Sequence, residues 1–297
     1  MKLKIWFLET RPQFLTLSVV LAFLGAAIAR YDGAFHLGYA LLAWVGLTLT
    51  HISVNVLNDY FDYRSGIDLR TRRTPFSGGS GVLPAALLPP RHVLYFGLGA
   101  LLAAVPIGIF FVVVRGIWLL PLLLVAAGCV LLYTPCLTRL GWPEWAPGVG
   151  LGALPVLGAY FVQTADYTLP AVIASVPSAI LVHNLLFLNE FPDAEADRPA
   201  GRKTLPITLG PARAAWLYVA LTVLVYLWVI GAVAAGQMPV WALLALLSLP
   251  FAVKAIRGAR HPDDMNRFMP AMAANVMVVL LTQLLLGIGY LLAGLLG

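Results

Sequence analysis

Charged residues are scarce in this sequence. They make up 11% of the chain, whereas soluble domains carry about 25%. No long polar run, internal repeat or linker marks a separate soluble domain. The two cysteines, Cys129 and Cys136, form neither a disulfide framework nor a metal-ligand pattern, and we expect both to be small buried residues. The low charge therefore excludes an ordinary soluble protein.

The chain is instead rich in long apolar segments. Hydrophobic residues make up 61% of the 297 residues, and the mean hydropathy is +0.88. A membrane-spanning helix needs about 20 apolar residues, so the chain has room for roughly nine of them. We therefore predict an all-α integral membrane protein, in which residues 1–297 form one domain with a bundle of helices around a central cavity. The predicted spans are 14–30, 38–58, 92–114, 117–134, 145–163, 169–190, 212–235, 239–256 and 270–295.

Basic residues indicate the orientation of these spans. If the N-terminus is inside, 17 of the 19 basic residues fall in inside segments, and only Arg30 and Arg115 fall outside. The positive-inside rule then places the N-terminus and the polar loops near 55–90 and 189–210 on the cytosolic side of a cytoplasmic (inner) membrane. The C-terminus is then outside. The net charge of +6 reflects this topology and does not indicate nucleic-acid binding. The basic segment before the first span lacks a small-residue cleavage site, so we expect an interfacial amphipathic helix there.

A polar stripe ends the second predicted span. Its members recur at spacings of three and four residues, which places them on one face of a helix. Polar side chains in a membrane helix must face a cavity or another helix. Gly66 can end this helix, and Asp68 follows in the loop. The alternative is a helix end with solvated, capping acids, but three aspartates and two asparagines within 14 residues exceed what a cap needs. The stripe consists of His51, Asn55, Asn58, Asp59 and Asp62.

A second acidic segment follows the sixth predicted span. Asn189, Asp193 and Asp197 are spaced i, i+4 and i+8, so they share one face if the helix continues. Pro192 cannot donate a backbone hydrogen bond, which predicts a kink or a new helix start. The residues beyond the segment, Arg202 to Thr204, supply donors suited to a diphosphate. The alternative is a charged loop between helices.

The chemistry of the two segments favours a metal site. Acids near a bilayer are costly and are rarely kept there without a function, yet seven of the chain's 13 acids lie in these two segments. Such clusters of hard oxygen ligands favour cations of the magnesium type, which are usually shared with phosphate. A divalent-cation or proton-coupled transporter would place acids near the membrane midplane, whereas both clusters here lie at one membrane face.

Two further loops belong to the same predicted face. Residues 70–81 combine three arginines with a glycine-rich turn, whose backbone N–H groups can contact phosphate oxygens. A merely flexible loop is equally consistent with this composition. Residues 133–144 bring together Tyr133, Arg139 and Glu144. They either contact a substrate or form an interfacial anchor.

These residues resemble the UbiA superfamily of intramembrane prenyltransferases. That family carries an Asn-x3-Asp-x3-Asp motif after its second span and an Asp-x3-Asp motif after its sixth. Asn58 and Asp62 match the first motif, although its third acid appears two residues late, as Asp68. Asp193 and Asp197 match the second motif. The shifted acid is similar to the 1,4-dihydroxy-2-naphthoate prenyltransferase branch, which acts in menaquinone synthesis, and so are the segments 11–12, 133–144 and 201–205.

The resemblance implies Mg²⁺-dependent transfer of a polyprenyl group from an isoprenyl diphosphate to an aromatic acceptor. The metal would make the diphosphate a good leaving group, and a water-poor cavity would protect the allylic cation. The implied catalytic residues are Asp62, Asp68, Asp193 and Asp197. The implied metal ligands are Asn58, Asp59, Asp62, Asp193 and Asp197. The implied substrate-binding residues are Asn55, Arg64, Arg72, Arg73, Tyr133, Arg139, Asn189, Arg202 and Lys203.

Several alternatives remain open at this point. The aromatic acceptor is expected to be 1,4-dihydroxy-2-naphthoate. Other members of the same superfamily use 4-hydroxybenzoate, homogentisate, haem, chlorophyllide or a glycerol lipid. A cation transporter and a non-catalytic scaffold are the alternatives from other classes. The sequence leaves the prenyl length, the oligomeric state and the acid that accepts the aromatic proton undetermined.

Overall fold

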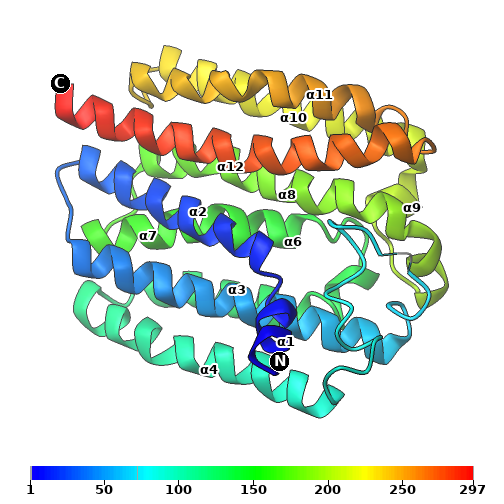
Figure 1. Cartoon of the computed structure of the whole chain (residues 1–297). Coiled ribbons are helices and arrows are strands. Elements are labelled where there is room, and N and C mark those ends of the chain that lie inside the picture. Colours follow the sequence, from blue (N-terminus) through cyan, green and yellow to red (C-terminus); the bar gives the residue numbers. More distant parts are fainter. Residues whose placement is uncertain (1, 72, 297) are drawn as a thin grey trace.

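The computed structural model describes residues 2–71 and 73–296, which contain helices and loops but no strand. This confirms the predicted all-α fold (Figure 1). The first half contains α1 (Lys2–Glu9), α2 (Pro12–Tyr31), α3 (Leu37–Ser65), α4 (Pro90–Arg115), α5 (Leu119–Leu132), η1 (Leu137–Arg139), α6 (Trp145–Pro147), η2 (Gly148–Ala153) and α7 (Leu154–Thr164). The second half contains α8 (Leu169–Asp197), η3 (Arg198–Ala200), α9 (Leu205–Leu209), α10 (Pro211–Ala234), η4 (Val240–Ser248), α11 (Leu249–Ala259) and α12 (Met265–Leu296).

The helices of the described residues agree with the predicted spans, and the protein is an integral, multi-pass membrane protein. Eight segments are long and apolar enough to cross a membrane, counting α6 to α7 and η4 to α11 as one segment each. The ninth predicted span, 117–134, corresponds to α5, which has 14 residues. A helix of that length covers about 21 Å, less than the hydrocarbon thickness of about 30 Å.

Proline and glycine explain several helix ends. Pro12, Pro90 and Pro211 each start a long helix, at a position where the missing N–H group is not needed. Gly66 ends α3 in the left-handed conformation, with φ 78°, as predicted. The N–H group of the next residue, Ile67, then donates to the carbonyl of Asp62 at 3.0 Å. This turn brings Asp68 back towards the end of α3.

Pro192 does not start a new helix. α8 runs without interruption from Leu169 to Asp197 and contains both Pro177 and Pro192. The restart that the sequence allowed is therefore not observed. Because the helix continues, Asn189, Asp193 and Asp197 lie along one side of α8 at spacings of four residues.

Buried polar contacts join helices inside the bundle. The Asn184 side chain on α8 donates to the Thr222 hydroxyl on α10 at 3.0 Å. The Tyr218 hydroxyl, also on α10, donates to Asn275 on α12 at 2.9 Å, and Asn275 donates to the backbone carbonyl of Asn184 at 3.1 Å. Such interhelical hydrogen bonds stabilise helix packing in lipid, where water cannot satisfy these groups.

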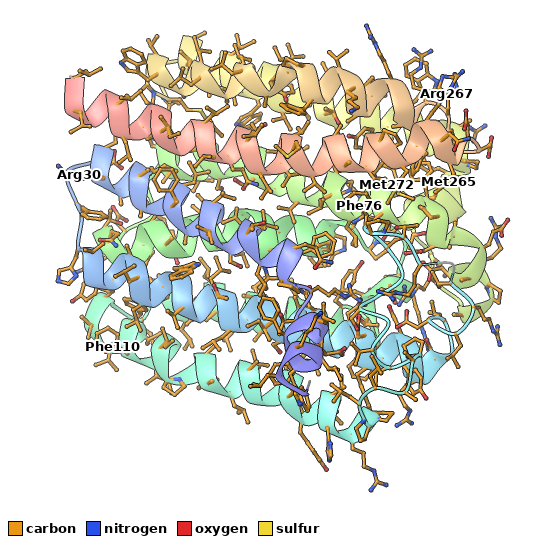
Figure 2. All side chains as sticks on the ribbon, in the orientation of Figure 1. Arg30, Phe76, Phe110, Met265, Arg267 and Met272 are labelled. Carbon is orange, nitrogen blue, oxygen red and sulfur yellow. The ribbon has the colours of Figure 1, made fainter. Side chains whose placement is uncertain are left out.

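The two ends of the bundle differ in character. Figure 1 shows α3 and α4 along one side of the molecule and α10 and α11 along the other, with α2, α7, α8 and α12 between them. Arg30 lies at one end of the bundle, and Arg267 lies at the other (Figure 2). The second end also carries the ends of α3 and α8 and the long loop before α4, and we call it the motif face.

Candidate functional site

The two acidic segments meet at Arg202. Its guanidinium donates to Asp197 on α8 at 3.0 Å and also pairs with Asp62 on α3. All three side chains are largely buried. Burial alone would lower the pKa of Arg202, but the carboxylates of Asp62 and Asp197 outweigh this effect and raise it. Arg202 is therefore a fixed cation that joins segments more than 130 residues apart in the sequence.

The first segment is organised by Asn58. Its amide nitrogen donates to Asp62 and to the Thr134 hydroxyl, both at 3.0 Å, and its oxygen accepts from Arg11 at 3.1 Å. Arg11 also pairs with Asp59. The chain turns from α1 into α2 at Arg11, in the left-handed region with φ 51°, which is uncommon for a residue with a side chain. This turn aims a second arginine at the acids.

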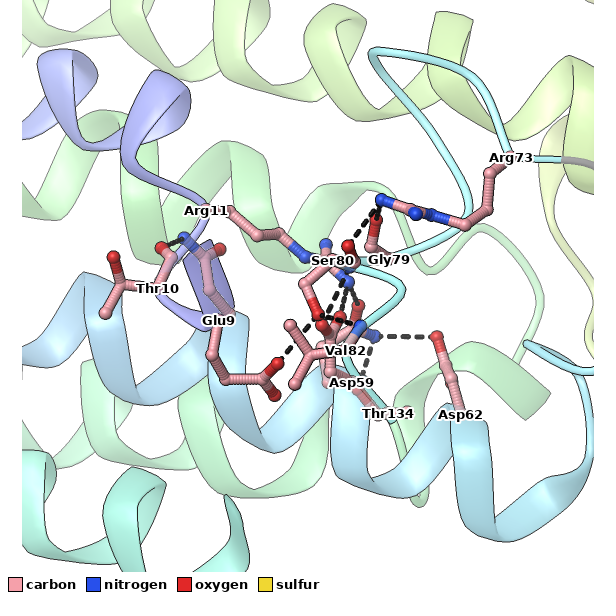
Figure 3. A network of polar contacts seen from close by, with 12 residues as sticks. Glu9, Thr10, Arg11, Asp59, Asp62, Arg73, Gly79, Ser80, Val82 and Thr134 are labelled. Atoms are coloured by element: carbon pink, nitrogen blue, oxygen red, sulfur yellow. Dashed lines mark hydrogen bonds and ion pairs between the residues drawn. The ribbon is translucent and has the colours of Figure 1, made fainter. Parts of the chain in front are cut away.

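The glycine-rich loop before α4 folds over the same acids (Figure 3). The Ser80 N–H group donates to Asp59 at 2.8 Å, and the Ser80 hydroxyl donates to Glu9 at 2.7 Å. Arg73 closes the loop by donating to the carbonyls of Gly79 and Ser80. The Ser80 N–H group is therefore already engaged by a carboxylate, although the sequence suggested phosphate as its partner.

Gly79 allows this close approach. Its φ of +69° disfavours a side chain, and a Cβ atom there would lie 3.1 Å from carboxylate oxygens of both Asp59 and Asp68. Asp68 is buried, and its pKa is raised to about 6, first by burial and then by the neighbouring charge of Asp62. The loop thus seals one side of the acidic cluster from water.

The second segment has oxygen atoms without partners. Among the described residues, buried oxygens of Asn189, Glu190 and Asp193 accept no hydrogen bond. The same holds for one oxygen of Glu144, whose other oxygen accepts from the N–H group of Leu205 at 2.5 Å. Unsatisfied buried polar groups are rare, and a bound ion is one explanation for them. These oxygens are hard acceptors, so a divalent cation suits them.

The donors suit a metal ion that is held by two protein side chains at a time. Among the described residues, no three His, Cys, Asp or Glu side chains converge as a complete metal site. Asn189 and Asp193 instead offer a pair of oxygens without partners, whereas Asn58 and Asp62 would exchange their contacts with Arg11 and Arg202 for a metal ion. Mg²⁺ is usually held by one or two carboxylates and completes its coordination with phosphate and water. The residues therefore fit Mg²⁺ that arrives together with a phosphorylated substrate.

An elongated apolar cavity of about 540 Å³ begins beside these groups. Its polar end is lined by Arg11, Asn55, Asn58 and Tyr133. The rest is lined mostly by apolar residues of the segments from α2 to α7, together with Leu186 of α8. Burial raises the pKa of Tyr133 well above its usual range, with a further contribution from Glu190, so its hydroxyl remains a neutral donor. A cavity of this form suits a molecule with a charged head and a long apolar tail.

The other predicted residues differ in their distance from the acids. Asn55 lines the cavity and donates to the carbonyl of Thr10 at 3.0 Å. Arg64 is exposed and donates to Tyr60 at 3.1 Å, so it points away from the acids. Arg139 and Lys203 are exposed at the motif face. Arg72 lies outside the described residues.

Reasoning from the sequence missed several members of the site. Arg11, Glu9 and Thr134 contact the first segment or its covering loop, yet all three are remote from the motifs in sequence. Arg11 had two signals: it is the third of three basic residues before the first span, and the segment 11–12 belongs to the resemblance described above. Thr134 lies in the segment 133–144 that the resemblance covers, but nothing in the sequence distinguished it within that segment. Glu9 had no signal, since a single acid near a helix end is ordinary.

Comparison with known proteins gives the class. The UbiA prenyltransferase family matches residues 18–278, so the chain belongs to this family and is a membrane prenyltransferase. The chain is 29% identical to a 1,4-dihydroxy-2-naphthoate octaprenyltransferase of Bacillus subtilis, over 96% of this chain and 91% of that protein. It is 30% identical to the UbiA prenyltransferase domain-containing protein 1 of Gallus gallus, over 95% of this chain and 82% of that protein.

Solved structures share the fold. A UbiA homologue from Aeropyrum pernix, solved in its apo form, matches with a TM-score of 0.64 at 18% identity, over 89% of this chain and 94% of its own. A homologue from Archaeoglobus fulgidus, solved with GPP and Mg²⁺ bound, matches with a TM-score of 0.58 at 13% identity, over 95% and 99%. At these identities the comparison supports the helical architecture alone.

Burial of Glu9 predicts a pH-dependent stability. Burial raises the pKa of Glu9 from 4.5 to about 7, although the Ser80 hydrogen bond opposes the shift. A carboxyl with a raised pKa stabilises the fold below pH 4.5, and this contribution is lost as the pH rises through 7. We expect the Tm in detergent to fall between pH 5 and pH 8. In Glu9→Gln this fall should be smaller, because the variant lacks the part of the pH-dependent unfolding free energy that Glu9 contributes, at most roughly 3 kcal/mol.

Glu195→Gln is the matched control, because Glu195 is exposed near the end of α8. It should show the same decrease in Tm between pH 5 and pH 8 as the wild type. An equally large decrease in Glu9→Gln would contradict the assignment to Glu9.

Proposed function

We propose that this protein transfers a polyprenyl group from an isoprenyl diphosphate to 1,4-dihydroxy-2-naphthoate, in a Mg²⁺-dependent step of menaquinone synthesis. The whole chain acts as one catalytic domain in this proposal. One observation carries it: the apolar cavity ends at Arg11 and Asn58, which contact the first acidic segment. Asn58 bonds to Asp62, and Arg202 joins Asp62 to Asp197 of the second segment. A prenyl tail in the cavity would hold its diphosphate among hard oxygen donors and cations. The Archaeoglobus fulgidus homologue was solved with GPP and Mg²⁺ bound, which supports the pairing of an isoprenyl diphosphate with Mg²⁺.

The proposal assigns a separate role to each group of residues. Asn58, Asp62, Asp193 and Asp197 would hold Mg²⁺, which when bound neutralises the diphosphate as it leaves. Asp59 is held by both Arg11 and the Ser80 N–H group, so we assign it and Asp68 to the layer behind these ligands. Asp62 and Asp197 would exchange their pairing with Arg202 for Mg²⁺. Arg202 and Arg11 are placed to stabilise the departing negative charge.

The reaction breaks one bond and forms another. The allylic carbon–oxygen bond breaks, and its electron pair leaves with the diphosphate. The allylic cation then forms a carbon–carbon bond with the electron-rich ring, and the attacked ring carbon loses a proton or, for a carboxylated carbon, CO₂. The apolar cavity walls exclude water, which would otherwise quench the cation as an alcohol.

The acceptor rests on the relatives. Several relatives similar over nearly the whole chain are described as 1,4-dihydroxy-2-naphthoate octaprenyltransferases. Hydroxybenzoate, homogentisate and the other superfamily acceptors are the alternatives.

The experiment is to incubate the purified protein with Mg²⁺, labelled polyprenyl diphosphates of several lengths and a panel of aromatic acceptors, and to identify products by mass. We expect a prenylated, decarboxylated naphthoate product and no turnover in excess EDTA. Full activity in EDTA would refute the metal requirement, and a product from another acceptor would refute the naphthoate assignment.

The assigned acids give a second prediction. Asp62→Asn and Asp193→Asn should each lower kcat by at least about 10²-fold, by analogy with the loss of one electrostatic stabiliser. Glu195→Gln is the matched control, since Glu195 lies on the same turn as the second segment but is exposed. Steady-state kinetics measure the effect, and Tm values show that each variant is folded. Normal turnover by a folded Asp62→Asn or Asp193→Asn would remove that residue from the proposed site.

We further propose that the motif face is cytosolic and that the membrane is the inner membrane. The positive-inside distribution supports this, and so does the cytosolic origin of diphosphates and soluble aromatic acids. In a background without Cys129 and Cys136, single cysteines can replace the exposed Glu195 and Asp263 at the motif face and Ala235 at the other end. A membrane-impermeant thiol reagent applied to intact cells should label only the Ala235 position. Labelling of the other two positions from outside would reverse the orientation.

A further inference from the structure

A second pocket lies at the motif face, where α11 ends and α12 begins. It has a volume of about 430 Å³. Five of its lining residues are cationic or histidine, namely Lys254, Arg257, Arg260, His261 and Arg267. No acid lines it. Arg267 lies at the α10–α12 side of the bundle (Figure 2), whereas the cavity described above lies among α2 to α7. The proposed function uses none of these residues.

The pocket exists because its floor is made of small residues. Gly258 on α11 and Ala271 on α12 are buried and line it. A Cβ atom on Gly258 would lie 2.5 Å from the carbonyl oxygen of Arg267 and 2.6 Å from the Cβ atom of Ala271. The two helices therefore touch through backbone at this point. The long cationic side chains surround the contact without filling the space above it.

The positive charge around the pocket is poorly balanced. Among the described residues, Arg267 pairs with Asp264 at 3.2 Å, and both side chains are largely exposed. Arg260 stacks on the Trp216 ring, with 4.7 Å between the guanidinium carbon and the ring centroid. Lys254 and Arg257 form no ion pair with any described residue. Four unequally paired cations repel one another, and an anion between them would relieve the repulsion.

An apolar stripe leads into this charge along α11. Leu249, Val253 and Arg257 are spaced i, i+4 and i+8, so they lie on one side of the helix. Leu249 and Val253 are 39% and 42% exposed, and they lie nearer the membrane interior than Arg257. Acyl chains followed by a phosphate have the same order as this stripe. A free phosphate ion has no apolar part that could contact the exposed apolar residues.

We propose that this pocket binds the headgroup of an anionic phospholipid, with the acyl chains along Leu249 and Val253. Basic pockets between membrane helices recognise such headgroups through several cations at once. Trp216, under Arg260, provides the aromatic group that commonly marks the interface. The positive-inside rule explains why cations lie at this face. It does not explain why four of them surround one depression at the end of an apolar stripe.

Native mass spectrometry of the purified full chain in detergent tests the proposal. The probes are dioleoyl phosphatidylglycerol and, for comparison, dioleoyl phosphatidylcholine. The wild type should bind the first phosphatidylglycerol more tightly than phosphatidylcholine. The double variant Lys254→Gln/Arg257→Gln should weaken that binding by on the order of tenfold or more, since each cation contributes separately. The affinity of the single variant Arg257→Gln for phosphatidylglycerol should lie between those of the wild type and the double variant. This variant keeps the test valid if the double variant is unstable.

Lys4→Gln/Arg91→Gln is the matched control. It removes the same charge from exposed positions before α2 and at the start of α4, away from the pocket. This control should bind phosphatidylglycerol as the wild type does. An equal loss in control and pocket variants would reduce the effect to net charge and overturn the site. Equal binding of the two lipids by the wild type would also overturn it.

A competition experiment distinguishes binding of a lipid headgroup from binding of a free anion. Inorganic phosphate or diphosphate at millimolar concentration should leave the bound phosphatidylglycerol in place, because neither anion uses the apolar stripe. Displacement by either anion would show a simple phosphate site and contradict the lipid proposal. The pocket variants should keep their prenyl transfer rate in phosphatidylcholine, since the pocket lies outside the catalytic cavity. A lost rate there would place these residues in the prenyl transfer site and overturn the proposal of a separate one.

Discussion

The site depends on two arginines that neutralise carboxylates at the edge of a membrane. Arg202 pairs with Asp62 and Asp197, and Arg11 pairs with Asp59. Removing one partner from a buried ion pair leaves an uncompensated charge and costs several kcal/mol, about 3–5 in measured cases. Arg202 therefore stabilises the contact between the ends of α3 and α8, and Arg11 stabilises the end of α3. The apolar cavity, the covering loop and the unpartnered oxygens are arranged around this contact.

Much of the architecture follows from composition. Eight of the predicted spans correspond to long apolar helices, because about 20 apolar residues in sequence have few alternatives to crossing a membrane. The end of α3 at Gly66 also followed from local chemistry. Pro192 shows the limit of such reasoning. A proline removes one hydrogen bond, but packing of α8 among its neighbours keeps the helix continuous, and a sequence pattern does not contain that packing.

The site was predictable only in part. Spacing placed Asp62 and Asp197 on helix faces, but their common partner, Arg202, required the fold. Glu9 reaches the first segment through Ser80, over a separation of 71 residues. Arg64 and Arg73 show the opposite case. Both are arginines beside the motif, yet one stacks on Tyr60 and the other closes its own loop. Proximity in sequence to an acidic motif does not determine where a flexible cation points.

Charge balance explains why metal and diphosphate should enter together. Asp59, Asp62, Asp68, Asp193 and Asp197 carry a formal charge of −5, and Arg11 and Arg202 supply +2, which leaves −3. A diphosphate ester carries roughly two to three further negative charges at neutral pH. Alone it would be repelled from a site of low dielectric constant, where charge repulsion is strong. Mg²⁺ bound together with the diphosphate would offset this negative charge. In the proposed function, the same carboxylates would therefore make binding of the diphosphate depend on Mg²⁺.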